Sequence, residues 1–143
     1  MNYFGYKSMK KLYLRIKKIT LMDPHELGRL GEDLACNYLI NKGYRILERN
    51  WHSGHKEIDI IALNDDVLVV VEVKTRKTGD YGDPDIAVGR DKQRMLIQAA
   101  NAYVRYKNLD VDVRFDIVSI LFSDEVPEIE HIEDAFIPPC CAR

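Results

Sequence analysis

Cysteine is scarce in this chain of 143 residues, and long apolar runs are absent. The three cysteines, Cys36, Cys140 and Cys141, are odd in number and form no CxxC pair, so neither a disulfide framework nor a zinc site is expected. The longest apolar run, residues 67–71, is much shorter than the roughly 20 residues that span a membrane. Lysines interrupt the basic N-terminus, which therefore has no signal-peptide core. The sequence predicts a cytoplasmic protein.

Neither sign of charge dominates, because the chain has 21 Lys and Arg residues and 23 Asp and Glu residues, for a net charge of −2. This balance excludes a general polycation that binds by charge alone. It does not exclude an enzyme that acts on nucleic acid, since carboxylates in a site lower the sum while basic residues gather on one surface. The absence of a glycine-rich phosphate loop argues against an enzyme acting on a small phosphate compound.

Residues 1–22 differ from the rest of the chain, because basic and apolar residues alternate there without a helical or strand period. Two interpretations stay open. The segment is either a flexible tail, which would be absent if translation started at Met22, or a basic arm that contacts phosphates. One core domain is predicted over residues 23–122, followed by an edge strand and tail over residues 123–143.

The hydrophobic pattern predicts two helices and five strands. Asp23 is a candidate N-cap for the first helix, Pro24 suits its first turn, and Gly43 is a candidate glycine after its end. The remaining elements are expected at residues 44–51, 57–63, 67–76, 91–106, 111–122 and 128–132, with a helix at 91–106 and strands elsewhere. The order αβββαβ predicts an α/β fold in which helices flank a mixed central sheet.

The second and third strands place charged residues on one face of a hairpin. If Asp65 and Asp66 form the turn, Asp59 lies opposite Glu72 and Glu57 opposite Lys74. Side chains alternate along a strand, so these four residues share one face. The same register gives the other face the apolar residues Ile58, Ile60, Val71 and Val73.

Directly opposed carboxylates destabilise a sheet, so Asp59 opposite Glu72 needs a compensating cation. Lys74 supplies part of that charge, and a divalent metal such as Mg²⁺ or Mn²⁺, which prefers oxygen ligands, would supply more. The alternative is a solvated face with a surface salt bridge between Glu57 and Lys74. Because the preceding run 67–71 is apolar on both faces, as in a central strand, the metal-site hypothesis is favoured.

At these residues the sequence resembles the YraN-like family of bacterial proteins, which are similar to endonucleases of the PD-(D/E)xK superfamily. It resembles archaeal Holliday-junction resolvases more distantly. The similarity covers roughly residues 23–122. The stretches that carry it are residues 28–35, 57–62, 71–76, Gly82–Pro84, Ala87–Val88, Lys92–Arg94 and Ala99–Ala100. The sequence departs from the family pattern at His52, Lys56 and residues 89–91.

The resemblance implies a restriction-endonuclease-like core and a Mg²⁺- or Mn²⁺-dependent site. It implies metal ligation by Asp59 and Glu72, with Glu32 acting directly or through a water. Lys74 would orient a water or neutralise developing charge. A polar residue at the start of the second helix would join them, either Lys92 or Gln93. Lys92 precedes the apolar stripe formed by Leu96, Ala99 and Tyr103, so Lys92 is favoured over Gln93 as the site residue.

The functional hypothesis is a metal-dependent nuclease that hydrolyses phosphodiester bonds, with structured or branched DNA as its expected partner. The resemblance also permits a homodimer. The alternative is a non-catalytic nucleic-acid-binding or assembly module that keeps the fold. The presence of Asp59, Glu72 and Lys74 together favours the enzyme.

Overall fold

The structure is a computed structural model, which describes residues 11, 14, 17–19, 21–79 and 88–138. Its elements follow the predicted order, and each lies within about two residues of its predicted bounds. They are α2 (Pro24–Asn41), β1 (Arg45–Ser53), β2 (Lys56–Asn64), β3 (Val67–Lys77), α3 (Arg90–Lys107), β4 (Asp112–Phe122) and β5 (Glu128–Ile132).

The ends of α2 follow from local sequence. The Asp23 side chain accepts a hydrogen bond of 2.9 Å from the Glu26 backbone N–H, and Pro24 occupies the first turn. This capping satisfies a donor that the first helical turn leaves free. Beyond the helix, Gly43 has a φ of +97°, a conformation that glycine adopts without steric cost. The predicted limits of this helix are confirmed.

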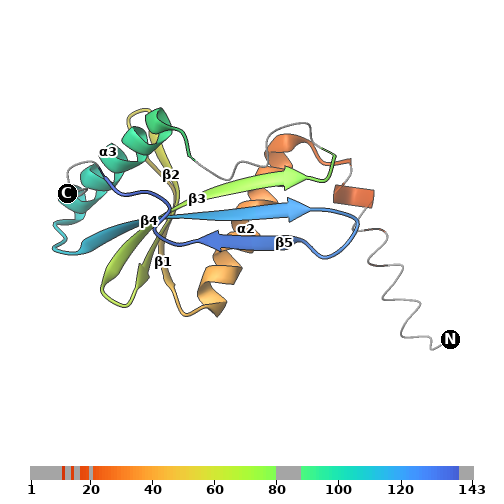
Figure 1. Ribbon diagram of the computed structural model, residues 1–143, viewed down its shortest axis with the longest axis horizontal. Coiled ribbons are helices and arrows are strands. Elements are labelled where there is room, and N and C mark those ends of the chain that lie inside the picture. The colour runs from red at the N-terminus through yellow and green to blue at the C-terminus, as the bar shows by residue number, and fades with distance from the viewer. Residues whose placement is uncertain (1–10, 12–13, 15–16, 20, 80–87, 139–143) are drawn as a thin grey trace.

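The five strands form one mixed sheet in the order β1-β2-β3-β4-β5. The pairs β1–β2, β2–β3 and β4–β5 are antiparallel, whereas β3 and β4 are parallel and are connected through α3. Figure 1 shows the β1–β2 hairpin turning away from the carboxyl end of β3. The architecture is the predicted restriction-endonuclease-like αβββαβ core, extended by the edge strand β5.

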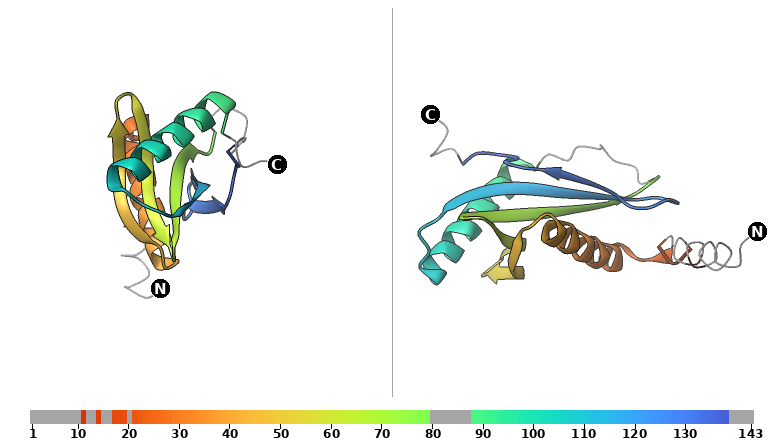
Figure 2. Two further views of the ribbon diagram at one scale, coloured as in Figure 1. Left: turned by 90° about the vertical axis from the view of Figure 1, so that its left-hand side faces the viewer. Right: turned by 90° about the horizontal axis from the view of Figure 1, so that it is seen from below.

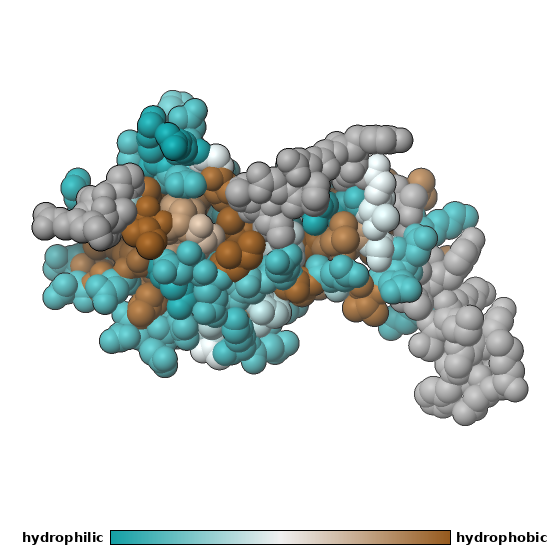
Figure 3. Space-filling view, viewed as in Figure 1, coloured by the Kyte–Doolittle hydropathy of each residue, from teal (hydrophilic) through white to brown (hydrophobic). Residues whose placement is uncertain are grey.

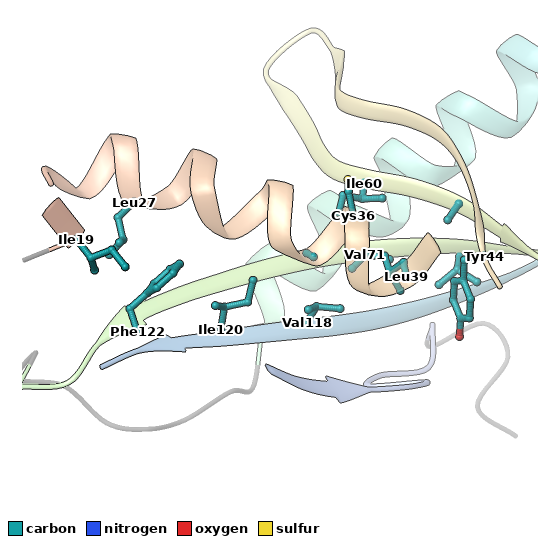
Figure 4. Close-up of a cluster of buried hydrophobic side chains, with 13 residues drawn as sticks. Ile19, Leu27, Cys36, Leu39, Tyr44, Ile60, Val71, Val118, Ile120 and Phe122 are labelled. Carbon is teal, nitrogen blue, oxygen red and sulfur yellow. The ribbon is translucent and has the colours of Figure 1, made fainter. Parts of the chain in front are cut away.

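The helices α2 and α3 cover opposite faces of the sheet, and each face has its own apolar core (Figures 1 and 2). On the α2 side, Leu39 packs with Val71 and Val118, as Figure 4 shows. On the α3 side, Leu96 and Tyr103 pack with strand residues that include Val70. Because β3 is covered on both faces, its run of residues 67–71 is apolar throughout.

A polar cluster fixes the C-terminal part of the chain to β4. The Asp116 carboxylate is fully buried and accepts two hydrogen bonds of 2.8 Å from Arg114. His131 Nε2 lies 2.8 Å from the same carboxylate, and the Asp134 backbone N–H donates a bond of 3.0 Å to it. Burial alone would raise the pKa of Asp116, but these hydrogen bonds outweigh burial and lower it.

Residues just before α2 contact the core, which matters for whether the N-terminal segment is needed for folding. Ile19 is buried beside Leu27 and Phe122, as Figure 4 shows. Lys77 Nζ donates a hydrogen bond of 2.9 Å to the Met22 carbonyl. The sequence alone predicts that all of residues 1–22 are dispensable for folding. The burial of Ile19 changes that expectation for the last residues of the segment.

Two truncations would separate these parts of the N-terminus. Removing residues 1–16 is expected to leave the melting temperature nearly unchanged. Removing residues 1–22 exposes Leu27 and Phe122 and should lower stability by about 1–3 kcal/mol, the scale of one buried aliphatic side chain. Thermal unfolding followed by circular dichroism measures both. Equal melting temperatures for the two truncations would show that Ile19 contributes nothing to the core.

On the side that Figure 3 shows, apolar residues lie in patches of different size among charged and polar neighbours. Within the described part of the chain, no helix is long and apolar enough to cross a membrane. Cys36 is buried and forms no disulfide, whereas Cys140 and Cys141 lie outside the described residues.

Candidate functional site

The site begins where β2 and β3 separate. Their ladder runs from the Asn64–Val67 pair to the Ile60–Val71 pair, which confirms the predicted register. It ends there, so the pairs predicted beyond it, Asp59 with Glu72 and Glu57 with Lys74, are not formed. The two strands form a fork, and the carboxylates lie at its mouth.

The ladder between β1 and β2 is also interrupted at Asp59. Pairs form on either side of it, but none forms at Asp59 itself, and the facing residue Asn50 has a φ of +49°. The interruption changes the side-chain alternation, so Ile58 joins the α3-side core while Ile60 joins the α2-side core. The prediction that Ile58 and Ile60 share a face is therefore wrong, because it assumed an unbroken strand.

Asp59 replaces the missing ladder contact with its side chain. Its Oδ2 atom accepts a hydrogen bond of 2.8 Å from the Val73 backbone N–H, which lies past the end of the β2–β3 ladder. The bond satisfies a backbone donor that the fork would otherwise leave free. It also fixes the Asp59 carboxylate against β3, next to Glu72.

Glu72 is the largely buried carboxylate that β3 brings to the site. Its side chain is 13% exposed, and Oε1 lies 3.4 Å from Lys92 Nζ on α3. Its other oxygen, Oε2, is buried and has no hydrogen-bond partner among the described residues. Leaving a buried polar atom unsatisfied costs about 1–3 kcal/mol, and more when the group is charged. A buried oxygen of this kind is available to a ligand that enters the fork.

The pKa of Asp59 is raised to about 7. Burial is the main cause, and the neighbouring charge of Glu72 adds to it. The Val73 N–H bond opposes the rise, Glu32 contributes to it, and Lys92 reduces it. A cation held beside Asp59 would favour its charged form and so oppose the rise of this pKa.

Glu32 reaches this region from α2, on the other side of the sheet. The preceding residue, Gly31, is buried against Thr75 of β3, and a Cβ atom on Gly31 would overlap Thr75 Oγ1. Glycine therefore allows α2 to approach β3 closely. That approach brings the partly buried Glu32 near enough for its charge to act on Asp59.

Substitution of the two α2 glycines tests this close approach. Gly31→Ala should destabilise the protein by about 1–3 kcal/mol, the usual cost of overpacking. Gly28→Ala is the matched control, because no atom lies within 4 Å of its added Cβ, and it should be neutral or slightly stabilising. Adding Thr75→Ala to Gly31→Ala should recover part of the loss in urea unfolding. Equal effects of the two glycine substitutions would contradict the packing argument.

The other candidate residues lie on β3 and α3. Lys74 is two residues past Glu72 on β3, partly buried, with Ser119 as its β4 neighbour. Gln93 Nε2 donates a hydrogen bond of 2.7 Å to the Val88 carbonyl, so it holds the segment that leads into α3. Of the two α3 candidates, Lys92 is the one that contacts a site carboxylate.

A divalent metal fits this donor set. Mg²⁺ commonly takes one or two carboxylates and keeps several waters. Asp59 and Glu72 provide such a pair, and the buried Glu72 Oε2 atom is free of protein partners within the described chain. No group of three or more His, Cys, Asp or Glu side chains arranged to hold a metal occurs among the described residues. A metal held here would therefore have these two carboxylates as its side-chain donors among the described residues.

The raised pKa of Asp59 predicts a pH dependence of stability. In the unfolded chain its pKa lies near 3.8, so the unfolded state loses the proton first as pH rises. Without metal, stability should fall between about pH 4 and pH 7, by up to about 1.4 kcal/mol per pH unit. Asp59→Asn should remove this loss. Unfolding free energies of both proteins across this range measure it, and parallel curves would contradict the assignment.

The comparisons place the chain among known proteins. The model of a family described as "Uncharacterised protein family UPF0102" matches residues 31–120. The chain belongs to this family. A UPF0102 protein of Parabacteroides distasonis is 49% identical over 116 residues, covering 81% of this chain and 96% of the relative. A UPF0102 protein of Geobacter metallireducens is 48% identical over 111 residues, covering 77% and 91%.

The UPF0102 match includes the whole candidate site, from Glu32 on α2 to Lys92 on α3. Two of the stretches that carry the sequence resemblance, Gly82–Pro84 and Ala87, lie outside the described residues.

Sequence reasoning did not find the Val73 N–H bond, the Gly31 contact or the Asp116 cluster. Asp116 gave one signal, because it is a charged residue between the apolar residues Phe115 and Ile117 of β4. The Val73 bond and the Gly31 contact depend on where the ladder ends and how α2 packs, which no local pattern shows.

Proposed function

We propose that this protein is a metal-dependent nuclease that hydrolyses phosphodiester bonds in nucleic acid, with structured or branched DNA as its substrate. The observation that carries the proposal is the pair of partly buried carboxylates at the mouth of the β2–β3 fork. One of them has a buried oxygen without a partner among the described residues, and the pKa of the other is raised by burial and by its neighbour. Perturbed carboxylates of this kind gather at functional sites.

Asp59 and Glu72 would hold Mg²⁺ or Mn²⁺. When bound, the metal would stabilise negative charge on a phosphate and lower the pKa of a water. Lys74 points to the same side of β3 as Glu72, so its ammonium group can orient the attacking water or neutralise charge that develops on the phosphate. Glu32 supplies a further acidic group from α2, which can accept a hydrogen bond from water.

One observation favours the alternative function, a nucleic-acid-binding module without catalysis. Lys92 Nζ lies 3.4 Å from Glu72 Oε1 and compensates part of the carboxylate charge without a metal. The Lys92 side chain is 44% exposed, however, so it can move away from Glu72 at little cost. The partnerless Oε2 atom stays uncompensated in either case.

A cleavage assay tests the proposal. The purified protein is incubated with Mg²⁺ or Mn²⁺ and with labelled duplex, single-stranded and four-way-junction DNA, and with duplex RNA. We expect cleavage that requires the metal and is strongest on a branched DNA. Glu72→Gln is the matched inactive control, since it keeps the shape of the side chain and removes its charge. Binding without cleavage on every substrate and with both metals would support the binding module instead.

A further inference from the structure

We propose that Lys74 and Arg76 form a phosphate track on β3, two cations that bind consecutive phosphates of one nucleic-acid strand lying along β3. The track rests on the proposed function and adds to it the path that the substrate strand takes from the site. It assigns a role to Arg76, which the site chemistry does not use.

The face of β3 on which the track lies follows from contacts on the opposite face. Thr75 lies against Gly31, and Lys77 donates a hydrogen bond to the Met22 carbonyl, so both point towards α2. The β3–β4 ladder is regular from residue 67 to residue 77, without a bulge. Side chains therefore alternate. The face away from α2 carries Glu72, Lys74 and Arg76.

The spacing on this face suits a nucleic-acid backbone. Residues two apart in a strand are separated by about 6.6 Å, which is comparable to the separation of neighbouring phosphates along one nucleic-acid strand. Glu72 at the mouth of the fork comes first, and Lys74 and Arg76 follow towards the carboxyl end of β3. A strand with its reacting phosphate between Glu72 and Lys74 would therefore place the next phosphate over Arg76.

Arg76 differs from the other arginines in its surroundings. It is partly buried and makes no hydrogen bond or ion pair with another described residue. The other described arginines that also have no such partner are all exposed: Arg29, Arg45, Arg90 and Arg105. A guanidinium group with five donors and restricted solvent access is suited to binding a phosphate from one side.

The neighbouring elements set the direction of the track. α3 packs mainly against β2 and β1, so it does not cover the carboxyl-terminal half of β3. Across β4, Glu130 is in register with Lys74, and Glu128 is in register with Arg76. Both glutamates are exposed on β5 and repel phosphates. The nucleic-acid strand is therefore held along β3 rather than across β5.

A simpler role for the two cations is to balance Glu128 and Glu130 across β4. In that case removing Arg76 would leave nucleic-acid binding unchanged. In a phosphate track, DNA affinity falls as the salt concentration rises, and each lost phosphate contact makes this fall less steep. For duplex DNA, the slope of log K against log salt changes by about 0.9 per contact.

The test measures DNA binding by fluorescence anisotropy over a range of NaCl concentrations, with Ca²⁺ replacing Mg²⁺ to prevent cleavage. We expect Arg76→Ala to weaken binding and to lower the salt slope by about 0.9 on duplex DNA. Arg76→Lys should restore most of that slope, because it keeps the charge. Arg105→Ala, an exposed arginine near the end of α3, is the control and should leave affinity and slope unchanged. Circular dichroism confirms that each variant is folded.

Neutral methylphosphonate linkages, placed one at a time along one DNA strand, locate the contacts. Wild type should lose affinity at two adjacent positions, and Arg76→Ala should be insensitive at one of them. If wild type binds DNA but Arg76→Ala keeps the same slope and the same sensitive positions, the track is wrong and the nuclease proposal stands. If wild type binds no DNA at all, both are overturned.

Discussion

Replacing Lys74 with Ala is expected to reduce cleavage by roughly 10²-fold or more while metal binding stays intact. The magnitude is typical of losing one positioned acid–base or electrostatic group. Metal binding should persist because the proposed ligands are Asp59 and Glu72, and the Val73 backbone N–H holds the Asp59 carboxylate. Single-turnover cleavage rates and Mn²⁺ titration of the same sample separate the two effects.

Asp59→Asn supplies the contrast to Lys74→Ala. The amide keeps an oxygen that can accept the Val73 N–H bond but removes the negative charge. It should weaken metal binding and abolish cleavage, while DNA affinity holds or rises because negative charge near the phosphates falls. Equal loss of metal binding in Lys74→Ala and Asp59→Asn would contradict the separation of ligand and lysine roles.

Asp116→Ala is expected to destabilise the fold by about 3–5 kcal/mol, the usual cost of removing one partner of a buried ion pair. The substitution removes the acceptor that Arg114 and the buried His131 ring share, so Arg114 keeps only its bond to the Tyr44 hydroxyl. It also loosens the segment after β5, because the Asp134 backbone N–H loses its bond to the same carboxylate while the β4–β5 ladder remains. Equilibrium unfolding in urea gives the change. Asp112→Ala on the same strand is the control, since Asp112 is exposed and its loss should cost no more than about 0.5 kcal/mol.

The effect of Asp116→Ala should depend on pH. The pKa of Asp116 is lower in the folded protein than its ordinary value of 3.8, so its contribution is full above that value. It is lost as pH falls through the folded pKa. The difference in unfolding free energy between wild type and Asp116→Ala should therefore shrink in acid below about pH 4. A difference that stays constant down to pH 2 would contradict the role assigned to the carboxylate.

Much of the fold can be predicted from local sequence. Asp23 and Gly43 mark the ends of α2, and the apolar run in β3 identifies a strand covered on both faces. The turn at Asp65 and Asp66 sets the hairpin register, which the ladder confirms. These features are local, because capping, turn geometry and side-chain alternation involve residues close in sequence.

The shape of the site could be predicted only in part. The acidic end of β3 and the helical position of Lys92 are visible in the sequence, and Lys92 does contact Glu72. The fork is not visible, because the end of the ladder at Ile60 and Val71 depends on how the β1–β2 hairpin turns away from β3. The Asp116 cluster joins residues far apart in sequence, so its partners depend on the complete fold.

The most direct test of the metal site is a crystal structure of the protein soaked in Mn²⁺, with anomalous diffraction recorded. We expect one strong anomalous peak within bonding distance of both the Asp59 and the Glu72 carboxylates, about 2.0–2.3 Å from oxygen. The peak should be absent from Glu72→Gln crystals soaked in the same way. No peak in wild type, with Lys92 still paired to Glu72, would show that these carboxylates do not hold a metal.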